Sequence, residues 1–291
     1  MNRLNIDFSE LMDLRVDYAF KLFFATGDTS RLVSLLNAIF AAKNIARVIT
    51  SLQVVNPHLE KMSGDDKLSV LDIRAVLSDG SSVCIEMHLY ALAELKYKML
   101  RSWARIYSEE LKTGDLYQAQ SPVICIAFTE GAAVVDGSET SVEKIHALYQ
   151  WMERDDHHLL TKDAEIHFIN MKAFLKMLEN GEPEWDALTR WLALITHQDI
   201  PDQKVLQEVC AEEEMRMAVE TLRRFSQDQY ERQAYQRRLD ELHAHKRMEL
   251  RLADAERRAT DSERQKADAE RQNLQLRKQL LELRARLDEE N

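Results

Sequence analysis

The amino-acid sequence predicts an α/β protein, in which a small mixed sheet flanked by helices is followed by a long α-helical extension. Short apolar runs typical of buried strands alternate with stretches in which apolar residues recur every three or four positions. Only seven glycines and four prolines occur in 291 residues, and none follows Pro201, which favours long helices. We therefore expect an α/β domain over residues 1–200 and a helical tail over residues 201–291.

Composition and charge narrow the class of protein. Hydrophobic residues make up 45% of the chain, enough for a packed core, and no apolar run is long enough to predict a membrane span. The N-terminus lacks the basic and apolar segments of a leader, and the three cysteines form no C-x-x-C pair, so we expect a cytoplasmic protein without disulfides or structural zinc. The formal net charge of −11 argues against strong non-specific DNA binding, although a local basic stripe would suffice.

The first part of the chain predicts two helices and a strand. Apolar residues recur at helical spacing in residues 14–25 and again in residues 31–43. Residues 48–55 have the composition of a strand, and the polar residues 57–67 are expected to form a loop.

The stretch from Leu68 to Tyr90 predicts a β-hairpin around which the rest of the domain is organised. Two mostly apolar runs flank the sequence Ser78-Asp79-Gly80-Ser81, which has the residues of a tight turn. If the loop contains an odd number of residues, even-numbered residues pair with even-numbered ones across the hairpin. A two-residue loop would give the other register, and the sequence does not decide between them.

In the first of these registers, three polar side chains share one face of the hairpin. They belong to Asp72 in the first strand and to Glu86 and His88 in the second. Two neighbouring carboxylates repel each other unless a positive charge lies between them, and Mg²⁺ or Mn²⁺ is the usual solution. The simpler alternative, that Asp72 is a strand-edge acid and Glu86 a solvated strand residue, stays open at this point.

Beyond the hairpin, helices and strands are expected to alternate. We expect helices over residues 91–112, 142–154, 171–180 and 184–196, and strands over residues 121–128 and 165–170. On the first of these helices, Lys98, Arg101 and Arg105 recur on a face of their own. They form either a solvated charged face or a stripe that contacts nucleic-acid phosphates beside the metal site.

Several ordered motifs between Asp13 and Phe174 resemble a known family. They are DYAFKLFF at residues 17–24, LVSLLNAI at 32–39, the D-x(13)-E-x-H spacing of the hairpin, IEMH at 85–88 and RSWARIYSEELKTG at 101–114. Together they resemble the PD-(D/E)XK nuclease superfamily, in its branch of recombination-promoting nucleases and transposases. The resemblance implies a restriction-endonuclease-like core and a Mg²⁺-dependent endodeoxyribonuclease that binds DNA.

The resemblance also implies roles for individual residues. Asp72 and Glu86 would bind the metal, and His88 would stand where the superfamily has lysine and this branch commonly has glutamine. Histidine can orient a water or act as a general base, but it is not a fixed positive charge. Asp17 and Lys21 would support the site from the first helix, although their i,i+4 spacing also fits a simple surface ion pair.

The tail predicts a parallel homodimeric coiled coil. Position a of the heptads falls on His245, Leu252, Ala259, Lys266, Asn273, Leu280 and Leu287, and position d on Met248, Ala255, Ser262, Ala269, Leu276 and Leu283. Asn273 at an a position favours parallel dimers. A single solvated helix is the alternative, because alanine, serine and lysine weaken the middle of the seam.

Two functions follow from these expectations. The first is a metal-dependent DNA endonuclease, with RNA as a substrate that the sequence does not exclude. The second is a catalytically impaired nuclease fold that serves as a coiled-coil interaction or regulatory module, which the acidic charge and His88 favour.

Overall fold

The computed structural model describes residues 6–55, 73–88, 95–110, 116–131, 144–181 and 185–289, apart from several side chains in the last helix. The chain divides into two compact units, Met1–Gln236 and Arg237–Asn291. In the described residues no helix is long and apolar enough to cross a membrane.

The first unit is built on a six-stranded mixed sheet in the order β1-β2-β3-β4-β6-β5. The strands are β1 (Leu52–Val54), β2 (Ile73–Leu77), β3 (Ser82–His88), β4 (Val123–Thr129), β5 (His146–Gln150) and β6 (Ala164–Asn170). Strands β1, β2 and β3 pair antiparallel, β3, β4 and β6 pair parallel, and β5 runs antiparallel at the far edge. The central strands β4 and β6 are buried along their whole length, which the continuous apolar run of β4 predicts.

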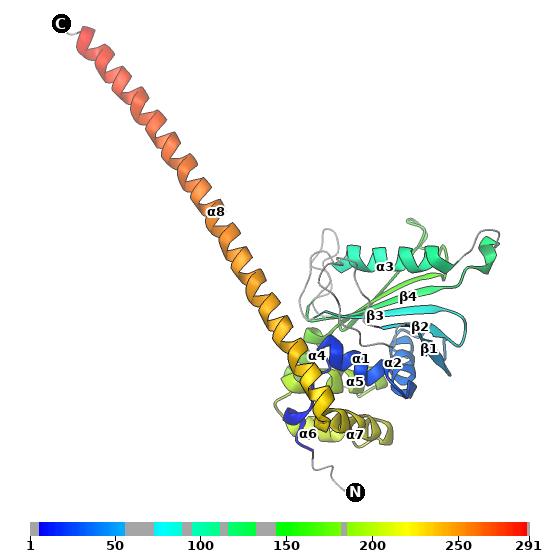
Figure 1. The fold of residues 1–291 in the computed structure, drawn as a ribbon. Coiled ribbons are helices and arrows are strands. Elements are labelled where there is room, and N and C mark those ends of the chain that lie inside the picture. Colours follow the sequence, from blue (N-terminus) through cyan, green and yellow to red (C-terminus); the bar gives the residue numbers. More distant parts are fainter. Residues whose placement is uncertain are drawn as a thin grey trace. The chain divides into compact units, whose positions relative to one another are not determined.

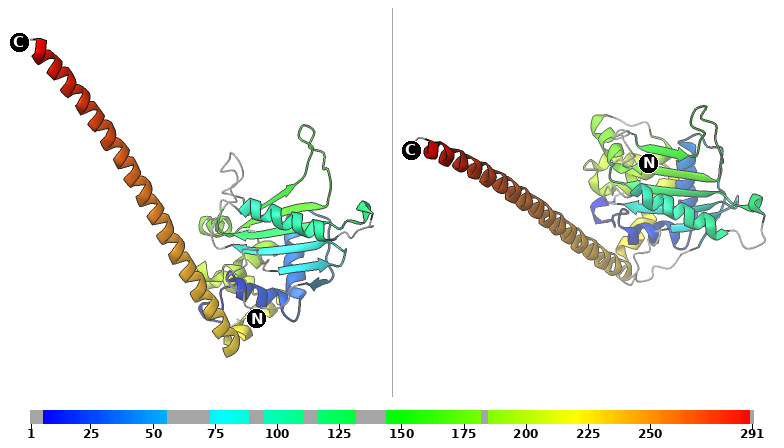
Figure 2. Two further views of the ribbon diagram at one scale, coloured as in Figure 1. Left: turned by 45° about the horizontal axis from the view of Figure 1, so that its top comes forward. Right: turned by 90° about the horizontal axis from the view of Figure 1, so that it is seen from above.

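Helices cover both faces of this sheet (Figure 1). Helix α3 (Leu95–Glu110) lies on one face, and α1 (Asp17–Ala25), α2 (Ser30–Ala41), α4 (Met171–Asn180) and α5 (Ala187–Ile195) lie on the other. The chain continues through α6 (Gln203–Val209), α7 (Glu213–Gln227) and α8 (Gln229–Glu289). Figure 2 shows the same layers from two further directions.

Each face of the sheet has its own core. Under α3, the side chains of Met99, Trp103 and Ile106 pack against Cys84 of β3 and Cys125 of β4. On the opposite face, the aromatic rings of α1 are central, because the Phe20 ring lies 5.7 Å from that of Phe128 on β4 and the Phe24 ring lies 5.5 Å from that of Trp191 on α5. The mixed α/β layers predicted from the sequence are therefore confirmed.

A buried polar cluster lies within this second core. Arg47 Nη1 is 3.0 Å from Glu165 Oε2, and that oxygen is 3.5 Å from His167 Nε2. His167 Nδ1 lies 2.9 Å from His146 Nε2. Since a carboxylate only accepts hydrogen bonds, His167 Nε2–H donates to Glu165 and His146 Nε2–H donates to His167 Nδ1.

The helix predicted over residues 142–154 was wrong, because His146–Gln150 forms strand β5. Ile145, Leu148 and Trp151 recur at helical spacing, but the segment pairs antiparallel with β6 from His146↔Ile169 to Gln150↔Glu165. Pairing with a strand that is distant in sequence overrode the local pattern.

The helical tail expected over residues 201–291 is not one continuous helix. The helical structure is interrupted twice, between α6 and α7 and again at Asp228. Asp228 ends α7 and its carboxylate accepts the backbone N–H groups of Tyr230 and Glu231, which is the role of an N-cap residue.

The compact first unit extends further than the expected domain boundary at residue 200. Helices α6 and α7 bury Leu206, Val209, Met215, Val219 and Leu222, so their apolar faces belong to the core of the first unit. The second unit contains only the later part of α8. Its pairing in a coiled coil stays a prediction.

Candidate active site

The register of the β2–β3 hairpin is the one that brings even-numbered residues opposite each other. Arg74 pairs with Cys84, and Val76 pairs with Ser82. The turn between the strands depends on Gly80, whose φ of 85° lies in the left-handed region that favours glycine. Its neighbour Asp79 accepts the backbone N–H of Ser81 through Oδ1. The register predicted for an odd-numbered loop is therefore confirmed.

Glu86 and His88 point to the face of the sheet that α3 covers. Side chains alternate along a strand, so they share the face of Cys84, which packs beneath α3. They lie in the C-terminal half of β3, where Glu86 pairs with Ala127 and His88 with Thr129 of the parallel strand β4. The carboxyl ends of parallel strands are the usual place for a binding site in an open α/β sheet.

Glu86 is the centre of a compact polar cluster. It is only 1% exposed. Its Oε2 atom lies 2.8 Å from His88 Nε2 and also forms an ion pair with the ammonium group of Lys98 on α3. Ser102 Oγ, one turn further along α3, is 3.5 Å from Glu86 Oε1. Oε2 is thus contacted from both the strand and the helix, and Oε1 is contacted from the helix.

These contacts keep Glu86 ionised. Burial by itself would raise the pKa of this carboxyl, but the hydrogen bond from His88 and the charge and hydrogen bond of Lys98 outweigh burial and lower the pKa below its ordinary value. Because an ionised carboxylate only accepts, the His88 Nε2 atom carries a proton and donates it to Glu86. The site therefore holds a desolvated anion with two nitrogen donors directed at one oxygen.

The structure divides the three basic residues that the sequence grouped in one stripe. Lys98 reaches into the site, with its Nζ atom 3.4 Å from His88 Nε2. Arg105 lies further along α3, 3.9 Å from Glu109, which also pairs with Arg74 of β2 at 2.9 Å. Arg101 is exposed on the outer side of the helix. Sequence reasoning missed the contact of Lys98 with Glu86, and it missed Ser102 altogether.

The remaining predicted residues lie outside this cluster or outside the described residues. Asp72 is outside the described residues and directly precedes Ile73, which pairs with Ile85 beside Glu86. Asp17 and Lys21 belong to α1, which packs on the opposite face of the sheet from α3. Their role as supporting residues stays a prediction.

The described residues fit a divalent metal ion only in part. An ionised, buried carboxylate such as Glu86 is a ligand type that Mg²⁺ and Mn²⁺ prefer, whereas an imidazole such as that of His88 is a more usual ligand of zinc, copper, iron or nickel. Within residues 6–55, 73–88, 95–110, 116–131, 144–181 and 185–289, no group of three potential ligands converges as a metal site. A metal site here would require Asp72 as a further ligand.

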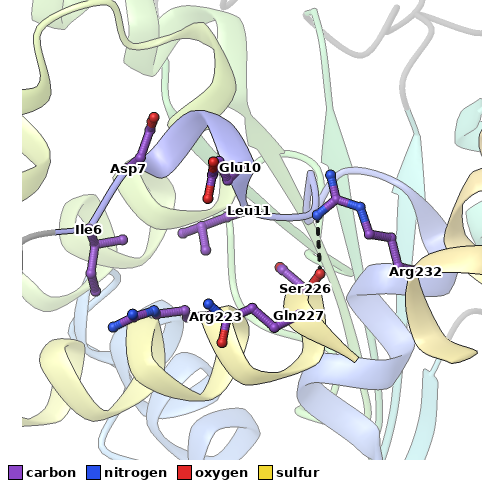
Figure 3. A pocket seen from close by; sticks show the side chains of 8 residues that line it. All are labelled: Ile6, Asp7, Glu10, Leu11, Arg223, Ser226, Gln227 and Arg232. Carbon is purple, nitrogen blue, oxygen red and sulfur yellow. Dashed lines mark hydrogen bonds between the residues drawn. The ribbon is translucent and has the colours of Figure 1, made fainter. Parts of the chain in front are cut away.

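A separate cavity of about 250 Å³ lies between the N-terminal segment, α7 and the start of α8 (Figure 3). Asp7 and Glu10 line it from the N-terminal segment, Arg223 from α7 and Arg232 from α8. Arg232 Nη1 donates to the backbone oxygen of Ser226 at 3.2 Å. Its mixed charge and its own set of lining residues distinguish it from the Glu86 site.

One comparison with known proteins identifies a relationship. A family model described as PD-(D/E)XK nuclease family transposase matches residues 14–253 of the chain. No curated protein and no solved structure matches it. The matched range includes all the strands, α3 and the Glu86 cluster.

Proposed function

Since the chain belongs to the PD-(D/E)XK nuclease family transposases, we propose that it is a metal-dependent endonuclease that hydrolyses phosphodiester bonds in DNA. The observation that carries the proposal is Glu86, a carboxylate that is 1% exposed and held ionised at the carboxyl end of β3. Burying a charge is costly, and Glu86 lies at the carboxyl ends of the parallel strands, where open α/β sheets usually bind their ligands. Buried carboxylates whose pKa is shifted by specific partners are found more often at functional sites.

In the proposed site, Asp72 and Glu86 hold Mg²⁺, or alternatively Mn²⁺, through carboxylate oxygens. When bound, the ion would polarise a phosphate oxygen and lower the pKa of an attacking water. His88 donates to Glu86 Oε2 over 2.8 Å and so fixes the orientation of the carboxylate. Ser102 supports the other oxygen of Glu86 from α3. Asp17 and Lys21 are proposed to support the site from α1.

The DNA is proposed to approach along α3. The exposed side of this helix carries Tyr97 and Arg101, with Lys96 Nζ 4.9 Å from the centre of the Tyr97 ring. Lysine and arginine contact phosphates, and aromatic rings stack on bases, so the helix offers a local basic stripe on an acidic chain. Arg105 contributes to this stripe less directly, because Glu109 lies beside it.

We further propose that α8 forms a parallel homodimeric coiled coil. Met248 and Leu276, both at d positions, are 74% and 57% exposed. A long helix gains most of its stability by packing an apolar seam against a partner. A dimer would carry two active sites, one for each strand of a DNA duplex.

Plasmid cleavage tests the proposed function. The wild-type chain with Mg²⁺ should convert supercoiled DNA to nicked and linear forms, and EDTA should abolish the conversion. Asp72→Asn and Glu86→Gln, which keep the side-chain shapes but remove the charges, should each lower the rate by about a hundredfold or more. A parallel reaction with single-stranded RNA distinguishes the two nucleic acids. Wild-type chain that cuts neither substrate with Mg²⁺ or Mn²⁺ would refute the proposal.

His88 favours a second candidate function. Without lysine or glutamine at this position, the fold would act as an interaction or regulatory module that dimerises through α8. This candidate predicts a folded dimer that binds DNA or a protein partner without cutting, and the same plasmid reactions separate the two functions.

A further inference from the structure

The active-site strand lacks a fixed positive charge, and the structure supplies one from α3. His88 follows Glu86 by two residues on β3, and histidine is not a fixed positive charge. Lys98 approaches the same carboxylate oxygen from the helix above, with its Nζ atom 3.4 Å from His88 Nε2. We infer that Lys98 is the positively charged residue of the reaction centre, supplied by the helix and not by the strand, with His88 as its neighbour. This inference rests on the proposed function of the Glu86 site.

The packing of α3 explains why Lys98 is directed at Glu86. Leu95, Met99 and Ile106 are at most 1% exposed and set the rotation of the helix over the sheet. Lys98 and Ser102 are four residues apart, so they lie one turn from each other on the same side of α3. Both contact Glu86, Lys98 at Oε2 and Ser102 at Oε1. The helix thus presents an ordered pair of donors to the site.

The partial exposure of Lys98 suits a role toward substrate. Its side chain is 31% exposed, whereas that of its partner Glu86 is 1% exposed. The Lys98 side chain therefore contacts the buried carboxylate and is also accessible from the solvent side of the cluster, where a phosphate would bind. Lysine is a compact point charge on a flexible stem, which allows it to neutralise Glu86 in the absence of substrate and to bind a non-bridging phosphate oxygen in its presence.

The contact at Oε2 predicts competition between Lys98 and a metal ion. A cation bound by Glu86 would share that oxygen with the ammonium group or displace it, because like charges a few ångströms apart repel each other. Removing the charge of Lys98 should therefore tighten metal binding while it weakens cleavage. A residue that only stabilises the fold would not produce these opposite effects.

The test compares the full-length wild type with four variants. Lys98→Gln removes the charge but keeps a hydrogen-bond donor, and Lys98→Arg keeps the charge. The double variant H88K/K98Q moves the positive charge to the strand. Lys162→Gln is the matched control, because it removes one exposed lysine before β6, at the opposite end of the parallel strands. Thermal melts followed by circular dichroism establish that each variant is folded.

Two readouts are measured on each variant, plasmid cleavage with Mg²⁺ and Mn²⁺ affinity by calorimetry without DNA. Lys98→Gln should lower cleavage about a hundredfold and tighten Mn²⁺ binding about tenfold. H88K/K98Q should recover part of the cleavage, and Lys98→Arg should resemble the wild type in Mn²⁺ affinity. If Lys98→Gln does not fold, the comparison of Lys98→Arg and H88K/K98Q with the wild type decides, since both keep a cation.

The outcomes separate this inference from the proposed function. Cleavage by Lys98→Gln at the wild-type rate would overturn the inference and leave the proposed function standing. Loss of cleavage without recovery in H88K/K98Q, together with unchanged Mn²⁺ affinity, would assign Lys98 a structural role and also overturn it. If the wild type does not cleave, the proposed function fails and the inference, which rests on it, is overturned as well.

Discussion

Acidification from pH 7 to pH 5 should destabilise the folded chain through His146. This side chain is 7% exposed, at the edge of the buried cluster that includes His167, Glu165 and Arg47. Burial, with the nearby charges of His167 and Lys43, lowers the pKa of His146 from 6.5 to about 3. Between these two values the unfolded chain binds a proton at His146 and the folded chain does not. The free energy of unfolding therefore decreases as the pH falls.

The size of this effect follows from the two pKa values. Above pH 6.5 the contribution of His146 to stability is complete, and below it the loss is about 1.4 kcal/mol per pH unit until the folded pKa is approached. At pH 5 the loss amounts to about 2 kcal/mol. The pKa values of His167 and His197 are also lowered, mainly by burial, so the wild type should lose more than this amount.

Urea unfolding followed by tryptophan fluorescence measures the effect at pH 7 and pH 5. His146→Gln isolates one histidine, because its amide group can still donate to His167 Nδ1 but does not titrate. The variant should lose about 2 kcal/mol less than the wild type between the two pH values. His158→Gln, which removes a histidine from the exposed turn after β5, is the matched control. Equal losses in the wild type and His146→Gln would refute the reasoning.

Three further predictions concern stability, assembly and DNA binding. Arg47→Met should lower the free energy of unfolding by about 3 kcal/mol, because Glu165 loses its cation inside the core; urea unfolding measures this, and an unchanged midpoint would contradict it. Leu276→Glu, at a d position of α8, should halve the mass measured by light scattering, whereas Leu250→Glu on the outer side of the predicted seam should not. Arg101→Ala should weaken DNA binding and reduce the salt slope of log K by about 1, and an unchanged slope in fluorescence anisotropy would exclude a phosphate contact.

Local residue chemistry was sufficient to predict the hairpin. Asp79 and Gly80 have the turn preferences that the structure uses, and the alternation along β3 places Glu86 and His88 on one face. The pairing of Arg74 with Cys84 shows which of the two possible registers the hairpin adopts. A sequence could only state both registers, because one added residue in the loop moves every side chain to the other face.

Local pattern was insufficient where distant segments decide the structure. The stretch that forms β5 has apolar residues at helical spacing, and only the edge of β6 made it a strand. Likewise, the break at Asp228 contains neither glycine nor proline, and depends on a carboxylate that caps the next helix. In both places the energy of a tertiary contact or a cap exceeded a small difference in intrinsic propensity.

The class of fold, the position of the hairpin and the placement of Glu86 and His88 on one face of it could be predicted from the amino-acid sequence. These properties depend on turn residues and on the period of the pattern, which are local. Only the tertiary structure decided that Lys98 belongs with Glu86, whereas Arg105 pairs with Glu109. The physical reason is that all the charges of α3 share one helix, and the rotation of that helix over the sheet, set by its buried apolar side chains, selects which of them reaches the buried carboxylate.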